Sequence, residues 1–510
     1  MKQKMPKSEQ RNESRKAGVR IGSELDWNQI DWKKVQDTVT RLQARIVKAQ
    51  KEKKYGKVKS LTRILTQSFA AKALAVKRVT TNRGGKTPGI DGVVWKTARA
   101  KAMAILELKP QGYRAKALRR RCIPKAGSNK LRPLGIPTMK DRAMQAVYAT
   151  ALLPIAETTG DANSYGFRPH RSCQDAIEQI GKIMRRRNRP GWILEGDIKG
   201  CFDNISHDWI IKHIPTDSKI LKQWLKCGYF ENDKKFFNEA GTPQGGIISP
   251  VIANMVLDGI ETMLFQKYRH LSFCSQTGEY YWKMPKGKSK QVNFVRYADD
   301  FIVTSNSKEV LENEIKPMIK AFLSERGLEL SDEKTIVTSI TEGFDFLGFT
   351  IREYKGTVLI TPAEKRMKRL RDKIGETITR MQGKSAEELI EALNPIIRGW
   401  TNYYRYVNSS KAFAKLRWWV WRRVWEWAKR QHHNKGAKWI KEKYFVSVKG
   451  SNWRFQAKKK DGTVITLVEP TDYKTRHFIK VQSGKNPFAP QDRQYFEQRE
   501  KTKVILATNL

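Results

Sequence analysis

The sequence has few cysteines, no long apolar run and no apolar segment near its first residue. Only five of its 510 residues are cysteine, and no two of them have the Cys-x-x-Cys spacing of a zinc cassette. This odd, widely spaced set argues against a disulfide framework and favours a reducing compartment. No apolar run is long enough to cross a bilayer, and the basic residues 1–20 do not have the pattern of a secretory signal. Membrane and extracellular roles are therefore disfavoured, and no membrane partner is expected.

Acidic residues are scarce relative to basic ones. Lys and Arg total 99 and Asp and Glu total 51, which gives a formal net charge of +48. A fold does not require this excess, so it indicates a polyanionic partner. Nucleic acid is the leading candidate, and an anionic lipid surface is a distant second. The hydrophobic fraction of 39% is sufficient for packed cores.

Composition and periodicity divide the chain into four segments. Residues 1–83 combine a basic tail with helices, one starting near Trp27 and one over 58–79. Residues 84–351 alternate short apolar runs with turns and helical stretches, which predicts a mixed α/β (α+β) fold. Residues 352–450 are helical in pattern, and residues 451–510 are basic. Periodicity predicts further helices over 352–395, 410–430 and 491–503 and a strand over 464–468.

Two short segments place acidic residues where burial is expected. Asp197 ends the apolar strand 192–197, and Asp299 and Asp300 interrupt an apolar strand pattern over 294–303. Adjacent aspartates in a turn are ordinarily unremarkable, because Asp favours turns. Carboxylates that converge from different strands, however, raise one another's pKa unless a cation lies between them. Oxygen ligands of this kind suit Mg²⁺, and a pair of such ions can activate a 3′-hydroxyl and stabilise a leaving pyrophosphate.

A glycine- and proline-rich loop, residues 241–250, lies between these two segments. Its final Ser249 and Pro250 are typical of a helix start, and the apolar residues 251–264 predict the helix. The loop could place Gln244 beside an incoming nucleotide, or it could be no more than a helix-entry turn.

These features together resemble a known family. The sequence Tyr-Ala-Asp-Asp at 297–300 resembles the YxDD box of reverse transcriptases, Asp197 resembles their first palm aspartate, and the Pro-Gln-Gly at 243–245 lies between them as it does in that family. The resemblance extends over nearly the whole chain to group II intron-encoded reverse transcriptases and maturases. The blocks that carry it are 121–125, 131–138, 164–169, 197–207, 344–349 and 393–404.

The resemblance implies a right-hand polymerase. Residues 1–83 would form an N-terminal extension, 84–351 the fingers and palm, 352–450 an α-helical thumb that doubles as the maturase (X) domain, and 451–510 a small basic C-terminal region. The block at 344–349 would grip the primer end.

The resemblance also assigns roles to individual residues. Asp197, Asp299 and Asp300 would hold two Mg²⁺ ions, with the backbone carbonyl of Ile198 as an additional ligand. The residues expected to bind the dNTP are Lys125 and Arg132 at the triphosphate, Phe202 as the gate against a 2′-hydroxyl, and Gln244 at the nucleotide or template base. An alternative for Phe202 is simple core packing. Arg168 in the block 164–169 could be structural, contact the template, or both.

The predicted helix 410–430 combines an aliphatic stripe with tryptophans and basic residues. The aliphatic stripe predicts core packing, and the tryptophans are expected to pack in part. Interleaved Trp and Arg also suit stacking and phosphate contact with structured RNA. The candidate RNA-binding residues are Arg417, Trp421, Arg422 and Arg423.

The expected partners are group II intron RNA, target DNA and dNTPs, with a second copy of the chain, as a homodimer, a further candidate. The resemblance implies RNA-directed DNA synthesis, assistance to splicing of the parent intron, and support of mobility by target-primed reverse transcription. Alternatives are a domesticated defence- or CRISPR-associated reverse transcriptase and a splicing-only RNA chaperone. No Cys follows Cys274, so we expect no C-terminal HNH-type endonuclease domain with paired metal ligands. Residues 451–510 could bind DNA or form a basic appendage. The expected location is a bacterial cytoplasm, at the nucleoid when bound to DNA, and an organellar host stays open.

Overall fold

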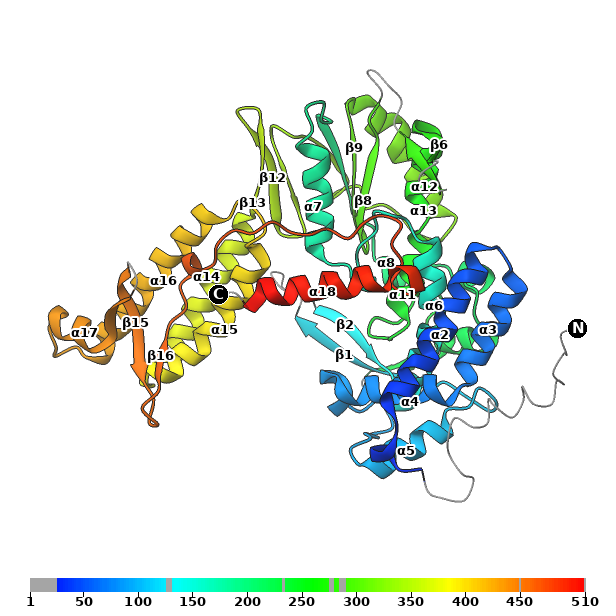
Figure 1. Ribbon diagram of the computed structural model, residues 1–510, viewed down its shortest axis with the longest axis horizontal. Coiled ribbons are helices and arrows are strands. Elements are labelled where there is room, and N and C mark those ends of the chain that lie inside the picture. The colour runs from blue at the N-terminus through cyan, green and yellow to red at the C-terminus, as the bar shows by residue number, and fades with distance from the viewer. Residues whose placement is uncertain are drawn as a thin grey trace, which may run out of the picture.

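The computed structural model describes residues 25–124, 131–231, 234–274, 279–283, 290–448 and 451–508. Three clusters of buried hydrophobic side chains hold it together. The first joins the N-terminal helices to one face of a central sheet, the second lies on the other face of that sheet, and the third fills the helices that follow residue 364. Figure 1 shows the N-terminal helices and the later helices on opposite sides of the molecule.

The N-terminal helices pack around a central helix, α6 (Met139–Thr159). The helix predicted over 58–79 is two helices, because Ser68 interrupts it. Its hydroxyl donates to the carbonyl of Leu65 at 2.8 Å and accepts from the amide of Ala71 at 3.1 Å, so the same residue ends one helix and caps the next. The elements are η1 (Trp27–Gln29), α2 (Trp32–Lys51), α3 (Tyr55–Gln67), α4 (Phe69–Thr81), η2 (Arg83–Lys86) and α5 (Ala98–Glu107).

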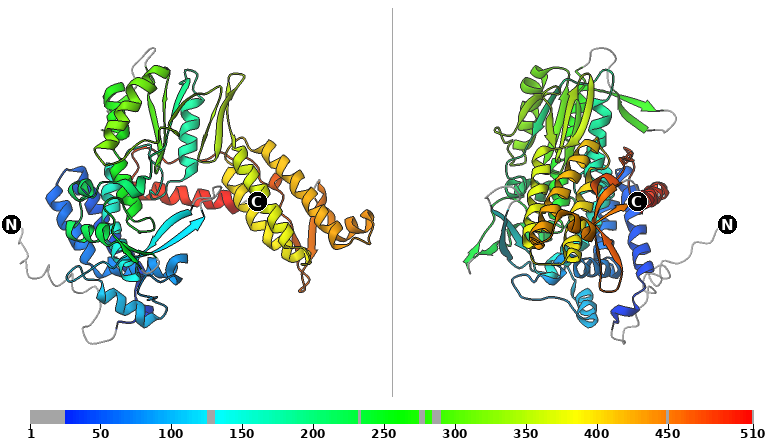
Figure 2. Two further views of the ribbon diagram at one scale, coloured as in Figure 1. Left: turned by 180° about the vertical axis from the view of Figure 1, so that it is seen from behind. Right: turned by 90° about the vertical axis from the view of Figure 1, so that its left-hand side faces the viewer.

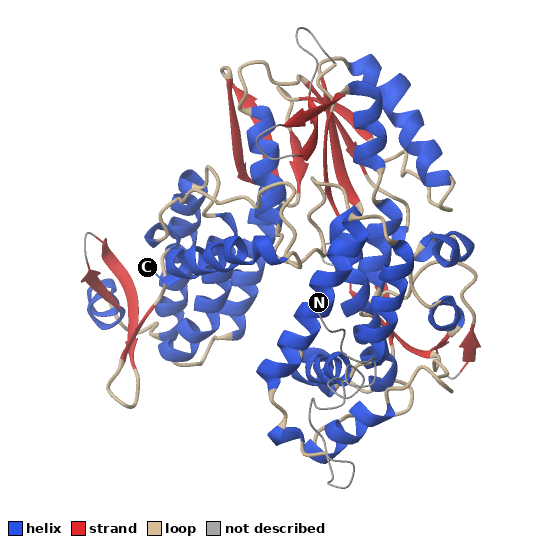
Figure 3. Cartoon of the chain, turned by 45° about the vertical axis from the view of Figure 1, so that its right-hand side comes forward, coloured by secondary structure: helices blue, strands red, loops and turns tan. Residues whose placement is uncertain are grey.

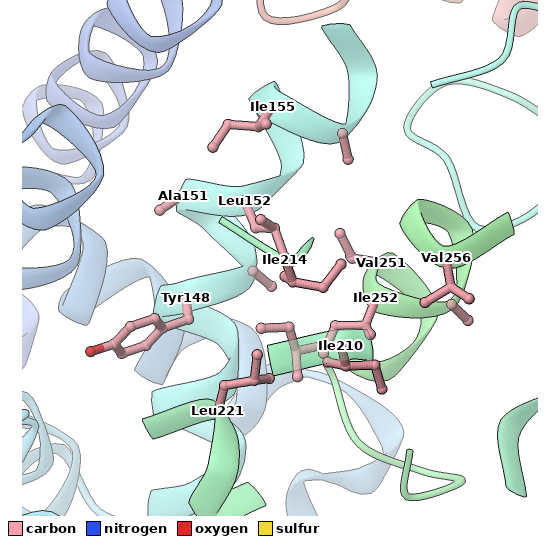
Figure 4. Close-up of a cluster of buried hydrophobic side chains, with 14 of the residues drawn as sticks. Tyr148, Ala151, Leu152, Ile155, Ile210, Ile214, Leu221, Val251, Ile252 and Val256 are labelled. Atoms are coloured by element: carbon pink, nitrogen blue, oxygen red, sulfur yellow. The ribbon is translucent and has the colours of Figure 1, made fainter. Parts of the chain in front are cut away.

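Helix α6 is buried on almost every face, and Figure 4 shows the side chains that surround it. Ile210 and Ile214 come from α9 (His207–His213) and its C-terminal cap, Leu221 comes from α10 (Ser218–Lys226), and Val251 comes from α11 (Ser249–Leu257). The helix predicted over 251–264 ends early, because Asp258 is extended, with a ψ of 141°, and Gly259 then adopts a φ of 108°. The chain then resumes as α12 (Ile260–Tyr268).

The central sheet has four strands in the order β10-β3-β9-β8, and all its pairings are antiparallel. Ile193, Val295 and Ile302 lie in the cluster formed with α7 (Cys173–Met184), whereas Leu194 and Phe301 lie in the cluster formed with the N-terminal half. Figure 3 shows helices on both sides of these strands. The strands are β3 (Trp192–Gly196), β8 (Asn293–Tyr297), β9 (Asp300–Ser305) and β10 (Ile336–Ser339). Between β9 and β10, η3 (Val310–Ile315) and α13 (Lys316–Ser324) add side chains to the first cluster.

Four smaller sheets surround this centre. The helix predicted over 352–395 is partly wrong, because alternating apolar residues continue as strands to Pro362 and the helix begins at Glu364. The smaller sheets contain β1 (Leu118–Pro124), β2 (Leu131–Ile136), β4 (Tyr229–Glu231) and β5 (Lys234–Phe236); β6 (His270–Cys274) and β7 (Glu279–Lys283); β11 (Phe344–Phe346), β12 (Phe349–Tyr354) and β13 (Thr357–Pro362); and β14 (Phe445–Val448), β15 (Ser451–Lys458) and β16 (Val464–Thr466).

The helices after residue 364 form a bundle, and the C-terminal segment leaves it and returns to the centre (Figure 2). The predicted helix 410–430 is confirmed as α16 (Ser410–Gln431), whereas the predicted helix 491–503 begins at Arg493 and continues to Thr508 as α18. Arg499 of α18 is buried and donates to the Asp175 carboxylate of α7 at 2.7 Å. The other elements are α8 (Cys201–Asn204), α14 (Glu364–Arg380), α15 (Ala386–Tyr404), α17 (Ala437–Tyr444), η4 (Pro470–Asp472) and η5 (Pro490–Asp492).

The four cysteines whose side chains are described, Cys122, Cys173, Cys201 and Cys227, are free thiols. Within the described ranges, no helix combines the length and the apolar character needed to span a bilayer.

Candidate active site and nucleic-acid surface

The register of the central sheet brings the two acidic segments together. Gly196 at the end of β3 pairs with Phe301, and Tyr297 at the end of β8 pairs with Asp300. Asp197 therefore follows β3 at the same sheet edge as the 297–300 turn. Gly196 is required at this position, because a Cβ there would lie 2.1 Å from the Phe301 ring. Asp197, Ile198 and Asp299 line one cleft of about 780 Å³.

The 297–300 turn rests on a second loop, residues 163–166. The amide of Tyr165 donates to the carbonyl of Arg296 at 2.9 Å, and a Cβ at Gly166 would lie 2.3 Å from the amide nitrogen of Ala298. Ala298 itself has a φ of 58°, the left-handed conformation that a tight turn between these strands requires. The glycine in the block 164–169 is thus explained by close approach to the acidic turn.

Buried Arg296 supports the turn from beneath. Its guanidinium donates to the Asn254 side-chain oxygen at 3.1 Å and to the carbonyl of Ala298 at 3.2 Å, and it forms an ion pair with Asp258. Arg296 is fully buried, so its charge depends on these partners. Burial raises the pKa of Asp258 to about 6, although the Arg296 charge opposes that shift. The acidic turn is therefore held by paired charged groups, and removing one of them would leave its partner as an unpaired buried charge.

Arg168 belongs to the same buried network. Its guanidinium makes two hydrogen bonds to the Glu157 carboxylate, at 2.7 and 2.9 Å, and a third to the carbonyl of Asp161 at 2.6 Å. Burial, followed by the neighbouring Glu261, raises the pKa of Asp161 to about 6. The structural alternative for Arg168 accounts for these contacts.

Lys334 is a residue of the cleft that the sequence did not single out. Its ammonium lies 2.7 Å from Oδ2 of Asp197, and it lines the same cleft. The hydrogen bond to Asp197, with a further contribution from Asp300, raises the pKa of Lys334. The acidic edge is therefore already paired with one cation of the chain itself. No sequence signal reveals this contact, since the two residues are 137 positions apart.

The oxygen atoms at this edge suit a hard divalent cation. Carboxylates come from two strand ends, and the bridge between Ile198 and Leu330 uses the carbonyl of Asp197 and the amide of Lys199, so it leaves the Ile198 carbonyl out of its hydrogen bonds. Among the residues that the structure describes, however, no three His, Cys, Asp or Glu side chains are already arranged as a metal site. Lys334 occupies one oxygen, Oδ2, of the Asp197 carboxylate.

Gln244 lines the same cleft and is held there by hydrogen bonds. The side-chain Nε2 of Gln244 donates to both carboxylate oxygens of Asp203, at 3.1 and 3.0 Å. The backbone carbonyl of Gln244 accepts from the backbone amide of Gly135 at 2.8 Å. A Cβ at Gly245 would lie 2.6 Å from the Gly135 carbonyl, so the loop is docked tightly on β2. Asp203 is a second residue of the cleft to which sequence reasoning gave no role.

The other candidate nucleotide-binding residues have different positions. Phe202 is half-buried, lines the cleft and meets Phe167 edge to face at 6.3 Å. It also packs against the first core cluster, as the core-packing interpretation expects, and its role as a gate stays a prediction. Arg132 is exposed and lines the cleft. Lys125 lies outside the described residues.

The candidate RNA-binding residues lie on α16, away from this cleft. Arg417 pairs with Glu469 at 2.9 Å, and Arg422 and Arg423 pair with Glu426 at 3.2 and 3.1 Å. Trp421 is half-buried and packs against Trp425 and Trp453, which fits the expected partial packing of the tryptophans. The more exposed ring of this helix is Trp418, at 58% exposure, which sequence periodicity alone could not separate from its neighbours.

Comparison with known proteins assigns three parts of the chain to described families. Residues 27–108 match the N-terminal domain of reverse transcriptase, residues 123–351 match reverse transcriptase (RNA-dependent DNA polymerase), and residues 367–445 match the group II intron maturase-specific domain. Their order along the chain is the order of the blocks found in the sequence.

Curated relatives agree with these matches. The group II intron-encoded protein LtrA of Lactococcus lactis subsp. cremoris is 33% identical over 328 residues, which cover 55% of this chain and 54% of LtrA. Protein YkfC of Escherichia coli (strain K12) is 32% identical over 324 residues, which cover 57% of this chain and 82% of YkfC. The chain belongs to the group II intron-encoded reverse transcriptase and maturase family. An uncharacterized 91 kDa protein in the cob intron of Schizosaccharomyces pombe is also similar to this chain, at 29% identity over 61% of this chain and 46% of that protein.

The family fixes the fold, which is that of a reverse transcriptase with mixed helices and strands. The chain spans about half the length of LtrA, the first of these relatives.

Proposed function

We propose that this family member is an RNA-directed DNA polymerase that also binds its parent group II intron RNA to assist splicing, and that it supports intron mobility by target-primed reverse transcription. The observation that carries the proposal is a single cleft lined by Asp197, Asp299, Arg132, Phe202 and Gln244. A cleft lined by acids, a cation and an amide has the groups needed to bind a nucleoside triphosphate and a primer end. The alternatives of a domesticated enzyme or a chaperone are not favoured, because residues 367–445 match the maturase-specific domain and residues 123–351 match reverse transcriptase.

In this proposal the architecture is that of a right hand. Residues 1–83 are an N-terminal extension and 84–351 form fingers and palm, with β1 and β2 in the fingers and the central sheet in the palm. Residues 352–450 form the thumb and maturase domain, and 451–510 form the basic C-terminal region. The separate buried cluster of α14, α15 and α16 supports a thumb with its own core.

Asp197, Asp299 and Asp300, with the carbonyl of Ile198, would hold two Mg²⁺ ions. When bound, the ions supply activation of the primer 3′-hydroxyl and stabilisation of charge on the triphosphate. Lys334 neutralises Asp197 before nucleotide binding and remains in the cleft as a cation for the phosphates. Arg296 holds the carbonyl of Ala298 and thereby keeps the 299–300 carboxylates at the sheet edge.

The chain's own side chains select the nucleotide. Lys125 and Arg132 bind the triphosphate, because fixed cations near phosphates stabilise the charge that shifts during transfer. Phe202 excludes a 2′-hydroxyl by contact, with its ring supported by Phe167. Asp203 holds the Gln244 amide in one orientation, so that Gln244 can contact the nucleotide or the template base.

Intron RNA would bind the basic surface of the maturase domain, including Arg417, Trp421, Arg422 and Arg423. Glu426 is one turn from Arg422 and Arg423 and is partly exposed, so phosphate groups can compete for these two arginines. Arg417 is held by a more buried partner, Glu469, which also pairs with Arg454. DNA contact by residues 451–510, a homodimer and a bacterial cytoplasmic location remain predictions from the sequence.

The decisive experiment is extension of a DNA primer annealed to an RNA template, with dNTPs and Mg²⁺. We expect primer-dependent synthesis of full-length complementary DNA. A chaperone without polymerase activity would bind the RNA and leave the primer unchanged, which would refute the proposal.

Two further measurements extend this test. Phe202→Ala is expected to increase ribonucleotide incorporation, and unchanged discrimination would remove the gate role. Sequencing of RNA that co-purifies with the protein identifies the intron, whose splicing in low Mg²⁺ should then require the protein.

A further inference from the structure

Helix α11 connects the two parts of the proposed active site. Its first residue, Ser249, lines the cleft shortly after the loop that carries Gln244. In that loop the backbone amide of Ile247 donates to the side-chain oxygen of Gln145 at 2.8 Å, so the start of α11 is held on helix α6. Five residues after Ser249, the same helix places Asn254 beside the groups that support the acidic turn.

Asn254 uses both ends of its side-chain amide. The amide nitrogen donates to the carbonyl of Gly166 at 2.8 Å, and the amide oxygen accepts from the Arg296 guanidinium at 3.1 Å. Asn254 is only 5% exposed, so these two partners take the place of water. Gly166 lies against the amide nitrogen of Ala298, and Arg296 donates to the Ala298 carbonyl at 3.2 Å. One side chain of α11 therefore holds two groups that contact Ala298 in the acidic turn.

The chemistry of the two partners requires an amide at this position. A guanidinium has only N–H donors, whereas a backbone carbonyl can only accept. A side chain that serves both must carry one acceptor and one donor a short distance apart, as the Asn254 amide does. An ionised carboxylate of the same shape would accept from Arg296 but would face the Gly166 carbonyl with a second acceptor. An apolar side chain would remove both hydrogen bonds.

Ala298 needs this support because of its backbone conformation. It has a φ of 58°, a left-handed conformation that costs a non-glycine residue free energy. The carbonyl of Ala298 belongs to the peptide that joins it to Asp299. Rotation of this peptide would therefore move the Asp299 side chain relative to Asp197, which follows the neighbouring strand β3.

We propose that Asn254 is a positioning residue for DNA synthesis: its amide locks the acidic turn to the helix that follows the Gln244 loop, and so fixes the acidic side chains relative to Gln244. This inference rests on the proposed function, in which the turn holds the metal ions and Gln244 contacts the nucleotide or the template base. Nucleotide transfer depends on the distance between the attacking hydroxyl and the phosphate, and a misplacement of about 1 Å costs about a hundredfold in rate.

A second asparagine provides a matched control. Asn293 is 6% exposed, accepts from the Arg269 guanidinium at 3.0 Å, and donates to the carbonyl of Gln291 at 2.9 Å. It thus bridges the same two kinds of partner as Asn254. Asn293 begins strand β8, and the acidic turn follows the other end of that strand, so the control lies in the same sheet but away from the turn.

The test compares Asn254→Ala with Asn293→Ala in the whole chain, by single-turnover insertion of one dNTP. Both variants lose hydrogen bonds to a guanidinium and to a carbonyl, so both should lose thermal stability. Rates are measured at a temperature at which thermal unfolding shows each variant to be folded. We expect Asn254→Ala to lower the insertion rate about tenfold with RNA affinity unchanged, because the turn is displaced. Asn293→Ala should match the unaltered protein in rate.

Metal binding gives a readout that needs no turnover. Mn²⁺ serves as the probe, because carboxylate ligands suit it as they suit Mg²⁺, and its bound fraction is measured by electron paramagnetic resonance without dNTP. Asn254→Ala should weaken Mn²⁺ binding several-fold, and Asn293→Ala should not. Asn254→Asp, a variant of the same shape, should also lower the insertion rate, because it cannot donate to Gly166 while ionised.

Each outcome bears on one proposal. Equal insertion rates for Asn254→Ala and the unaltered protein would overturn the positioning role, as would equal losses of rate in Asn254→Ala and Asn293→Ala. An unchanged rate for Asn254→Asp would overturn the requirement for an amide that both donates and accepts. Failure of the unaltered protein to extend any primer would refute the proposed polymerase function itself.

Discussion

The acidic turn and the basic maturase helices keep their charges in opposite ways. The turn at 297–300 stands on a fully buried arginine with three separate partners. Helix α14, in contrast, exposes Lys365, Lys368 and Arg369 to solvent. A buried charge is fixed in place but costly if left alone, whereas an exposed charge is inexpensive and adaptable. In the proposed function, rigid charge lies where the reaction needs geometry, and the exposed charge of α14 would add to the attraction that the α16 arginines exert on RNA.

The largest effect is expected when one acidic side chain is removed from the turn. Asp299→Ala is expected to lower primer extension about a thousandfold, because a missing carboxylate removes several kcal/mol of metal-dependent stabilisation. RNA affinity should remain within about twofold, since that affinity depends on distant cations. The measurement is single-turnover extension beside filter binding. The control is Asp208→Asn, which changes an exposed acid in the first turn of α9. Near-normal extension by the Asp299→Ala protein would disprove the metal assignment.

Removing the buried support should be almost as damaging. Arg296→Met leaves Asp258 without its partner inside the protein, which we expect to cost about 3–5 kcal/mol of stability. The midpoint of denaturant unfolding of the part of the chain that contains the sheet should fall accordingly. Adding Asp258→Asn to Arg296→Met should recover part of the loss, because the uncompensated charge is then gone. A midpoint equal to that of the unaltered protein would show that the network is dispensable.

Removing exposed charges from α14 should change the affinity for RNA and leave stability unchanged. Lys365→Gln, Lys368→Gln and Arg369→Gln together should reduce the slope of log affinity against log salt by about three and weaken RNA binding. Thermal stability should not change, since these side chains are exposed. Lys212→Gln, Lys219→Gln and Lys222→Gln remove the same charge from exposed positions of α9 and α10. An equal loss of RNA affinity in both triple variants would mean that net charge, and no particular surface, drives binding.

The same contrast explains how much could be predicted from the sequence. Strand patterns that ended in acids were sufficient to predict that Asp197 would meet the 299–300 turn, because β3 and β9 pair in a simple antiparallel register. Breaks within helices were missed at Ser68 and Gly259, since apolar periodicity continues through both positions. A capping hydroxyl or a single glycine is a local signal that competes weakly with a long apolar pattern.

Contacts across the cleft could not be predicted. Lys334 meets Asp197 across 137 positions, and Gln244 meets Asp203 across 41, and neither pair shares an element or a periodic pattern. The return of the C-terminal segment to α7 was missed for the same reason. Its anchor, Arg499, is one arginine in a polar helix, and only tertiary structure shows that it is buried against Asp175.

Lys480 lies between the two classes of charge, because it is half-buried and has no ion-pair partner comparable to that of Arg296. It lies on the C-terminal segment beside α7, where burial, and then the charge of Lys182, lower its pKa to about 8, against the opposing influence of Asp175 and Glu178. In the unfolded chain this lysine keeps its proton up to about pH 10.4. Burial of the ammonium therefore destabilises the folded state fully below pH 8, and this penalty is lost as the pH rises from 8 to about 10.4.

Replacing Lys480 should therefore stabilise the protein, by the smallest effect predicted here. Lys480→Met is expected to gain about 1 kcal/mol at pH 7, a figure reduced for the partial exposure of the side chain. The gain should shrink between pH 8 and pH 10 in thermal unfolding, while Lys474→Met, an exposed neighbour on the same segment, should show no such trend. A loss of stability at pH 7 would mean that Asp175 and Glu178 stabilise the ammonium by more than burial costs. Half-buried cations would then belong with the buried, paired charges of the acidic turn.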